Sequence, residues 1–385
     1  MDIKSCEDKQ SSCHLDICQA EHDRNTPEVN LLTPLDIRSV KLRNRIVCTP
    51  MCQYIAKDGF ADDWHLVHLG SRAVGGAGLV FVEATAVTPQ GRITHGDLGL
   101  WSDEHIPPLA RIAAFISRMG SVPAIQLAHA GRKGSCLQPW NHNGRFIPLE
   151  DGGWPLIAPS PIPFYSEDPA PQEIDKEGIK KIIKAFIEAA LRAIKAGFKI
   201  IEVHSAHGYL LHSFLSPLSN HRQDEYGGSL QNRMRLLLEV VQELRKVIPE
   251  EMPLFTRISA SDWVEGGWDI EQSVELAQAL KLHGVDLIDV SSGGLVPHAK
   301  IPIRAGYQVP FAAKIREKSL VKTGAVGLIT EPIQANEIVT SGAADLVFIG
   351  REMLRDPYFG LHAEHALDRN QNWPISYGYA VRKII

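Results

Sequence analysis

The chain has 385 residues, of which 44% are hydrophobic and 22% are charged, and its formal net charge at pH 7 is −5. This composition is typical of a globular protein with a substantial core, and the length fits one large α/β domain or two average domains. The acidic balance argues against nucleic-acid binding. No apolar run reaches the length needed to span a bilayer, which argues against a membrane protein.

The first thirty residues are polar and charged and show neither helical nor strand periodicity. They lack the basic and apolar regions of a secretory signal, so we interpret residues 1–30 as a flexible extension. Cys6, Cys13, Cys18 and His14 would be the ligands of a metal-binding tail, but their spacing fits no common zinc pattern, which favours free thiols. The three cysteines in the rest of the chain indicate no disulfide framework either, and the sequence therefore predicts a reducing, cytoplasmic compartment.

Short apolar runs alternate with segments of helical period from residue 45 onward. Most of these runs are apolar at nearly every position, as in parallel strands that are covered by helices on one side and by packed side chains on the other. The predicted strands are Arg45–Pro50, Gly78–Val87, Pro123–Ala130, Phe198–His204, Pro253–Ser259, Val285–Ser291, Ala325–Ile329 and Ala344–Gly350.

The clearest predicted helix, Lys176–Ala196, has Asp175 as its N-cap and Gly197 as its C-terminal stop. The other predicted helices are Ser229–Val247, Ile270–His283, Val309–Lys318 and Ile333–Ser341. Strands separated by helices in this way predict an α/β fold, a TIM (β/α)8 barrel over residues 31–365. A doubly wound nucleotide-binding sheet is the main alternative, but the glycine-rich segment Gly75–Gly78 precedes a strand instead of following one.

Residues 132–174 form an unusually long connection after the third predicted strand, rich in proline, glycine and tryptophan. Long loops in compact domains are usually lids, binding loops or linkers. In a TIM barrel this loop would stand above the catalytic face, so we expect a lid over the active site, with a solvent-exposed decoration as the alternative.

Chemistry in a TIM barrel is carried by residues at the C-terminal ends of the strands. Gly327 near the seventh predicted strand, and Gly350 and Arg351 after the eighth, suit a phosphate site, because glycine lets backbone N–H groups approach and arginine offers two parallel hydrogen bonds. Arg351 would alternatively pair with Asp356. The other polar residues at strand ends are Thr49, Cys52, Tyr54, Gln126, His129, Arg132, His204, His207, Tyr209, Arg257, Ser291 and Ser292.

His204, His207 and Tyr209 follow one another closely after the fourth predicted strand. Residues three apart on a continuous strand point to opposite faces, so both histidines can face the cavity only if the strand ends between them. A metal site would need at least one further ligand, and two core histidines are a second alternative. We favour a pair of imidazole N–H donors that hold an oxygen gaining negative charge. Tyr209 would then deliver a proton, with an aromatic ring packed under the lid as its alternative.

Arg257 lies within an otherwise apolar predicted strand, where an unpaired guanidinium is costly to bury. A structural salt bridge would satisfy it. A reduced flavin, which is negative near its N1 atom, would also be a matching ligand.

With these residues assembled, the sequence resembles the Old Yellow Enzyme family of flavin-dependent ene-reductases. The TPMCQY form of one motif is similar to the thermophilic-like branch associated with bacterial xenobiotic reductases. The resemblance implies a TIM barrel with FMN that uses NADPH or NADH to reduce the activated C=C bond of enones, maleimides and nitroalkenes. The segments that carry the likeness, in order over about residues 31–360, are TPMCQY, VEATAV, IQLAHAGRK, HSAHGYLLHSFLSPLSNHRQDEYGGSLQNR and IGREMLRDP.

The resemblance also implies roles for single residues. His204 and His207 would bind the substrate carbonyl, and Tyr54 would border the substrate pocket. Tyr209 would donate the proton that follows hydride transfer from flavin N5 in a ping-pong cycle. Cys52 would tune the flavin potential, although a buried small hydrophobic residue is the other interpretation. The residues implied in FMN binding are Thr49, Pro50, Met51, Cys52, Ala84, Gln126, Arg257, Gly327, Gly350 and Arg351.

The resemblance further implies a homodimer or homotetramer, because the branch often ends in a tyrosine and an arginine that reaches a neighbouring subunit. We therefore interpret residues 366–385 as a C-terminal tail and a candidate subunit interface, with Tyr377 in the tyrosine position; Arg382 lies further on than the usual spacing. Two other functions stay open at this point. One is a metal-dependent barrel lyase or hydrolase that uses His204 and His207, and the other is a flavin-binding protein without turnover.

Overall fold

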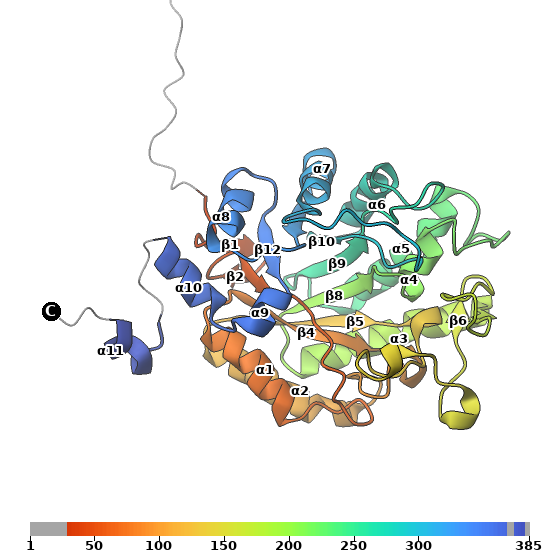
Figure 1. Cartoon of the computed structure of the whole chain (residues 1–385), viewed down its shortest axis with the longest axis horizontal. Coiled ribbons are helices and arrows are strands. Elements are labelled where there is room, and N and C mark those ends of the chain that lie inside the picture. The colour runs from red at the N-terminus through yellow and green to blue at the C-terminus, as the bar shows by residue number, and fades with distance from the viewer. Residues whose placement is uncertain (1–28, 368–372, 382–385) are drawn as a thin grey trace, which may run out of the picture.

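A closed barrel of parallel strands forms the centre of the computed structural model, which describes residues 29–367 and 373–381 (Figure 1). The strands follow their sequence order around the barrel, and β12 pairs with β3 to close it. The predicted (β/α)8 barrel is therefore confirmed. The barrel strands are β3 (Ile46–Cys48), β4 (Leu79–Ala86), β5 (Val122–Ala128), β8 (Ile200–Ser205), β9 (Leu254–Ser259), β10 (Leu287–Ser291), β11 (Lys322–Ala325) and β12 (Leu346–Ile349).

Helices connect consecutive strands and surround the barrel, as Figure 1 shows. Each of the five helices predicted from the sequence is present, with ends shifted by at most about one residue, within the usual uncertainty of helix ends. Among the described residues, no helix combines the length and the apolar character needed to cross a bilayer. The helices are α1 (Asp63–Val74), α2 (Ile106–Arg118), α3 (Lys176–Lys195), α4 (Leu210–Leu215), α5 (Leu230–Val247), α6 (Ile270–Leu282), α7 (Val309–Ser319), α8 (Pro332–Thr340), α9 (Arg351–Arg355), α10 (Phe359–Ala366) and α11 (Gly378–Val381).

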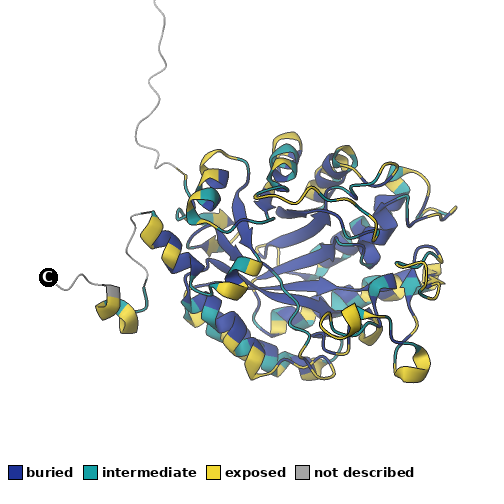
Figure 2. Ribbon diagram, viewed as in Figure 1, coloured by how far each residue is buried: buried dark blue, intermediate teal, exposed yellow. Residues whose placement is uncertain are grey.

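The helix α3 illustrates how local sequence sets these elements. The Asp175 side chain accepts the backbone N–H of Gly178 at 2.7 Å and so caps the first turn, as the sequence predicts. Its apolar residues recur at helical spacing and are buried on one side, whereas the opposite side is exposed, a division that all the outer helices share in Figure 2. Gly197, with φ of +92°, then ends the helix in the left-handed region.

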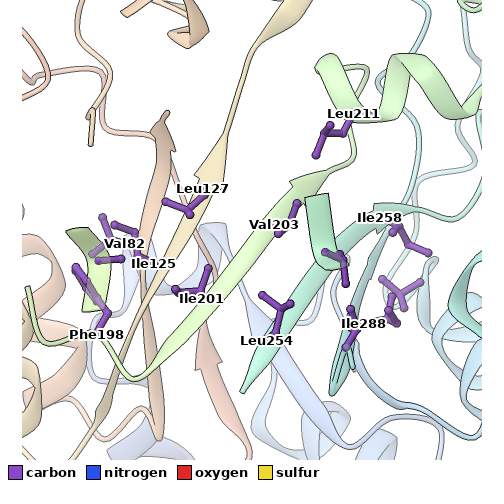
Figure 3. Packing of buried hydrophobic residues seen from close by; sticks show 14 of the residues in the cluster. Val82, Ile125, Leu127, Phe198, Ile201, Val203, Leu211, Leu254, Ile258 and Ile288 are labelled. Carbon is purple, nitrogen blue, oxygen red and sulfur yellow. The ribbon is translucent and has the colours of Figure 1, made fainter. Parts of the chain in front are cut away.

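The core has two parts, separated by the wall of strands. The larger part lies between the strands and the helices and contains the outward-facing side chains of Figure 3, such as Val203 and Ile258. The smaller part fills the barrel itself, where the rings of Phe81 and Phe348 lie 5.9 Å apart and those of Phe81 and Phe255 lie 6.2 Å apart. The barrel is therefore a packed core at this level and not a pore.

An antiparallel hairpin of β1 (Leu35–Ile37) and β2 (Val40–Leu42) precedes the barrel. Its buried residues Ile37 and Leu42 belong to the same cluster as the phenylalanines inside the barrel. Because the cluster also contains the first residues of barrel strands, such as Leu79, Leu287 and Leu346, the hairpin covers the N-terminal end of the barrel. The C-terminal end is left for polar residues.

The seventh strand lies elsewhere than predicted. The sequence predicts it over Ala325–Ile329, but β11 covers Lys322–Ala325 and pairs there with β10 and β12. The apolar run that follows is a loop, because Gly327 with φ of +124° and Leu328 with φ of +49° leave the extended region. The prediction failed because the real strand begins on two polar residues that continuous hydrophobicity does not detect.

Residues 132–174 contain little regular structure, as expected, but they include a short parallel pair of strands. The predicted extension over residues 1–30 falls almost wholly outside the described residues, and so does Arg382 of the predicted C-terminal tail. The remaining short elements are β6 (Ile157–Ala158), β7 (Gln172–Glu173) and the 3₁₀ turns η1 (Pro89–Gly91), η2 (Asp103–His105), η3 (Gly131–Lys133), η4 (His142–Gly144), η5 (Leu149–Asp151) and η6 (Ile375–Tyr377).

Replacing Gly324 with alanine should destabilise the barrel, because a Cβ atom at this position would overlap the ring of Phe348. Overpacking of a well-packed core typically costs about 1–3 kcal/mol of unfolding free energy, which urea unfolding measures. The second change Phe348→Leu removes the overlapping ring atoms, so the double variant should lose less than the two single variants together. Strictly additive losses would contradict this explanation.

Candidate active site at the mouth of the barrel

The inner face of the barrel changes from apolar to polar along each strand. On β8, Ile200 belongs to the interior cluster, and the residues that share its face further along are Glu202 and His204. On β9, Phe255 belongs to the same cluster and Arg257 follows it on the same face. The C-terminal end of the barrel is therefore lined by polar side chains standing on an apolar floor.

The Arg257 guanidinium is buried there against a carboxylate. Its Nε atom lies 3.1 Å from Oδ2 of Asp289 on the neighbouring strand, and its Nη1 donates to the Thr49 hydroxyl at 3.0 Å. Burial raises the pKa of Asp289 to about 6, and the Arg257 charge opposes that rise. The salt bridge that the sequence offered as one explanation of Arg257 is thus present, and the Thr49 hydroxyl is the second partner of the guanidinium.

Gln126 and Glu202 form a second buried pair beside it. The Gln126 amide donates to Oε1 of Glu202 at 2.8 Å, while Oε2 of Glu202 has no hydrogen-bond partner among the described residues. Burial, and then the negative charge of Asp289, raise the pKa of Glu202 well above its usual value. Burial and the neighbouring Asp289 thus both favour the protonated form of Glu202.

His204 and His207 face each other because β8 ends at Ser205, between them, as their spacing requires. The ring centroids of the two histidines are 5.2 Å apart, and the Tyr209 ring is 5.1 Å from that of His204. His207 turns with φ of +59°, and its backbone N–H donates to the Ser259 hydroxyl at 2.9 Å. The three side chains considered for chemistry are therefore neighbours.

These three side chains are uncharged at neutral pH. Burial, followed by the positive charge of Arg257, lowers the pKa of His204 and His207 well below the usual value. Burial raises the pKa of the Tyr209 phenol well above its usual value. Each histidine thus has one N–H to donate, and Tyr209 keeps a proton that it can transfer.

The two histidine rings differ in their hydrogen bonds. The Nε2 atom of His207 lies 2.7 Å from the Ser291 hydroxyl. The Nδ1 atom of His204 is buried and, within the described part of the chain, has no partner. Because a buried polar atom is costly without a hydrogen bond, His204 Nδ1 is suited to a ligand oxygen at this point.

Lys133 connects residues 132–174 to this group, a role that the sequence did not reveal. Its ammonium donates to the backbone carbonyls of His207 and Gly294 at 2.8 and 2.9 Å, and it lies 4.2 Å from the centroid of the Phe164 ring. Burial, and then the nearby Arg132 charge, lower the pKa of Lys133 to about 8. The bonds of Lys133 hold the backbone of His207 in its left-handed conformation.

A cavity of about 270 Å³ lies between residues 132–174 and the mouth of the barrel. Tyr54 and Tyr209 border it on the barrel side, and most of its wall is apolar or aromatic. Residues of the long segment therefore form part of the cavity wall, and its role as a lid stays a prediction. The other lining residues are Ile93, Thr94, Arg132, Lys133, Gly134, Cys136, Leu137, Pro139, Asn143, Gly144, Phe146, Phe164, Tyr165 and Asp168.

Tyr54 and Cys52 lie on the loop after β3, close to Ala84 at the bulged end of β4. Tyr54 adopts φ of +55°, and its ring packs edge-on against Trp140 at 6.0 Å. Burial, and then the charge of Glu83, raise the pKa of the Cys52 thiol well above its usual value. Cys52 is therefore a thiol and not a thiolate at neutral pH.

Gly350, which follows the last barrel strand, leaves space beside its backbone. A Cβ atom added to Gly350 would meet, within 4 Å, only Thr49 Cγ2 at 3.4 Å in the described structure. Arg351 is exposed and forms no ion pair with a described carboxylate; Asp356, its alternative partner from the sequence, accepts from His362 at 2.7 Å. Gly350, Arg351 and the buried polar layer are thus chemically compatible with the phosphate and the ring of FMN.

A metal site finds no support in the described ranges. Neither residues 29–367 nor residues 373–381 contain a group of three or more His, Cys, Asp or Glu side chains arranged to hold a metal ion. His204 and His207 have a tyrosine and an arginine as their neighbours, which are not ligands that zinc prefers.

The site thus combines two neutral imidazoles with a buried arginine at the mouth of a TIM barrel. This combination is compatible with a flavin-dependent oxidoreductase. The chain belongs to the NADH:flavin oxidoreductase / NADH oxidase family, whose model matches residues 30–370, and this is the Old Yellow Enzyme family that the sequence resembles. FMN is accordingly its cofactor, and NAD(P)H is its electron donor.

Individual relatives agree with this assignment. The NADPH dehydrogenase of Bacillus subtilis is 49% identical over 349 residues, which cover 90% of this chain and 98% of the relative. Morphinone reductase superposes with a TM-score of 0.74 at 26% identity and covers 88% of this chain and 90% of its own. The complex of 2-naphthoyl-CoA reductase with 2-naphthoyl-CoA gives a TM-score of 0.79 at 27% identity over 88% of this chain; the matched part is 52% of that protein, about half its length.

Replacing Asp289 with asparagine should lower the unfolding free energy, because the Arg257 guanidinium would stay buried without its counter-charge. Removing one partner of a buried ion pair typically costs about 3–5 kcal/mol. Urea unfolding at equal FMN saturation measures the loss. Asp103→Asn is the control, because the exposed Asp103 carboxylate forms only surface ion pairs, with Arg192 and Lys195, and its loss should change stability little. Equal stability of the two variants would show that the buried pair contributes no more than the surface pair.

Proposed function

We propose that the protein is an FMN-dependent ene-reductase that reduces the activated C=C bond of α,β-unsaturated carbonyl compounds with NAD(P)H. The observation that carries this proposal is the cluster of His204, His207 and Tyr209, three uncharged donors beside an apolar cavity, in which the His204 ring lies 5.2 Å from that of His207 and 5.1 Å from that of Tyr209. Such donors suit an oxygen that gains negative charge during a reaction.

The cofactor would be held by the polar layer and by the glycines after the last strands. Arg257, Gln126 and Thr49 would contact the ring system, and Gly327, Gly350 and Arg351 would surround the phosphate. The remaining expected contacts are Pro50, Met51, Cys52 and Ala84. When bound, FMN supplies a hydride acceptor for NAD(P)H and a hydride donor for the alkene.

The histidines would activate the substrate through its carbonyl oxygen. If the Ser291 hydroxyl donates to Nε2 of His207, that imidazole carries its hydrogen on Nδ1 and donates it, while His204 donates from its partnerless Nδ1. Both N–H groups draw electron density toward the oxygen and make the β-carbon of the alkene electrophilic. Because the imidazoles are neutral, they stabilise the developing enolate without surrendering a proton to it.

Tyr209 would complete the reduction as general acid. Its raised pKa keeps the phenol protonated until the α-carbon of the enolate takes that proton, and solvent then restores it. The aromatic and aliphatic cavity wall suits the apolar parts of enones, maleimides and nitroalkenes. We also propose a homodimer or homotetramer, in which the region around Tyr377 is the candidate contact.

Tyr209→Phe should slow reoxidation of the reduced holoenzyme by 2-cyclohexenone by roughly a hundredfold or more, because the variant lacks the general acid. Reduction of the flavin by NADPH needs no proton from this phenol and should proceed near the wild-type rate. Anaerobic stopped-flow absorbance resolves the two half-reactions. Unchanged rates in both would remove Tyr209 from the mechanism.

His204→Ala and His207→Ala should each weaken binding of 4-hydroxybenzaldehyde to the oxidised holoenzyme by about tenfold, because each removes one hydrogen bond to the phenolic oxygen. Titration followed by the flavin absorbance gives Kd without turnover. His221→Asn, an exposed histidine outside the site, is the control and should leave Kd unchanged. Full affinity in the double variant would contradict the role of both histidines as oxygen donors.

A further inference from the structure

Glu83 is an extra residue in the wall of the barrel. The strand β4 pairs Val82 with Ile125 and Ala84 with Gln126, so Glu83 has no counterpart on β5 and forms a β-bulge. Bulges recur beside active sites, where they redirect a side chain. Glu83 is buried, with an exposed fraction of only 3%.

The redirected carboxylate binds the loop that carries Cys52 and Tyr54. Its Oε2 atom accepts the backbone N–H of Gln53 at 2.5 Å, and the carboxylate also accepts the N–H of Tyr54. Consecutive backbone N–H groups next to a left-handed residue form a concavity for an anion, and Tyr54 has φ of +55°. The left-handed turn at Tyr54, which is unfavourable for a bulky residue, thus depends on Glu83.

Helix α1 supplies the partner of this carboxylate. The Nε2 atom of His65 lies 3.3 Å from Oε1 of Glu83, and its Nδ1 atom lies 2.8 Å from Oδ1 of Asp62 at the start of the helix. Burial lowers the pKa of His65, but Glu83 and Asp62 together raise it above its usual value. A continuous chain of contacts therefore runs from the exposed Asp62 through His65 and Glu83 to the backbone of the loop.

We propose that Glu83, with His65 as its partner, is a positioning residue that fixes Met51–Tyr54 and so places the Tyr54 ring at the cavity for substrate binding. Glu83 acts on the Tyr54 side chain only indirectly, through the backbone N–H groups of Gln53 and Tyr54. The consequence for substrate binding rests on the proposed function. The consequence for the loop does not, because it follows from the contacts alone.

Glu83→Gln tests the proposal in the FMN-loaded protein. Glutamine has the same shape but a single acceptor oxygen, so it cannot accept from both backbone N–H groups and also face His65. Hydrogen–deuterium exchange of the peptide with residues 51–56 should accelerate by about tenfold, the effect of losing one hydrogen bond to a charged acceptor. A peptide from β8 should keep its exchange rate and report that the barrel is intact.

Ligand binding provides the second readout. The Kd for 4-hydroxybenzaldehyde and the KM for 2-cyclohexenone should rise by about tenfold, while the limiting rate of flavin reduction by NADPH stays near the wild-type value. Glu275→Gln, which changes an exposed glutamate on α6, is the matched control. Should Glu83→Gln not fold, His65→Gln leaves the carboxylate in place and should shift both readouts in the same direction by a smaller factor.

The outcomes separate the two proposals. Faster exchange with weaker binding supports the positioning role. Faster exchange in a protein that reduces no alkene supports the effect on the loop and contradicts only the proposed function. Unchanged Kd and KM, with nothing altered except thermal stability, would overturn the proposal and leave Glu83 as a purely structural residue.

Discussion

The Arg257 guanidinium is buried inside the mouth of the barrel, and much of the surrounding arrangement follows from this one charge. Asp289 balances it at 3.1 Å, and Thr49 accepts one of its hydrogen bonds. The Arg257 charge, after burial itself, is the next cause that lowers the pKa of both histidines. One buried cation thus requires one carboxylate and at the same time keeps the imidazoles neutral, the state in which each donates a single N–H.

Closure of the barrel makes such a layer possible. Side chains alternate along every strand, so positions two apart share the interior, and the apolar part of that interior contains Phe81, Phe255 and Phe348. The hairpin of β1 and β2 covers that apolar end. The polar layer lies at the other end, where Lys133 donates to the His207 carbonyl and where a ligand can satisfy the polar atoms that the protein leaves without a partner.

Much of this arrangement was predictable from local patterns. Seven of the eight barrel strands and five helices are recognisable from periodicity, and the break between His204 and His207 follows from the two-residue period of a strand. Asp289 carried the same signal as Arg257, a charged residue in an apolar strand, but its partnership depends on the register between β9 and β10. That register is a long-range property, so the sequence alone could not pair the two residues.

Other features had weak signals or none. The bulge at Glu83 changes neither the apolar pattern nor the length of the strand, and Lys133 reaches His207 across 74 residues of sequence. The strand β11 begins with Lys322 and Thr323, which a search for apolar runs passes over. In each case the deciding contact is between segments far apart in the chain.

The central claim is that this mouth reduces alkenes with hydride that comes from NAD(P)H. The most direct measurement mixes the holoenzyme, reduced anaerobically by NADPH, with 2-cyclohexenone while the flavin absorbance is followed and the product is quantified. The account predicts that the oxidised flavin spectrum returns and that cyclohexanone forms in a one-to-one ratio with the flavin reoxidised. A flavin that NADPH bleaches but that stays reduced in the presence of the enone would contradict it.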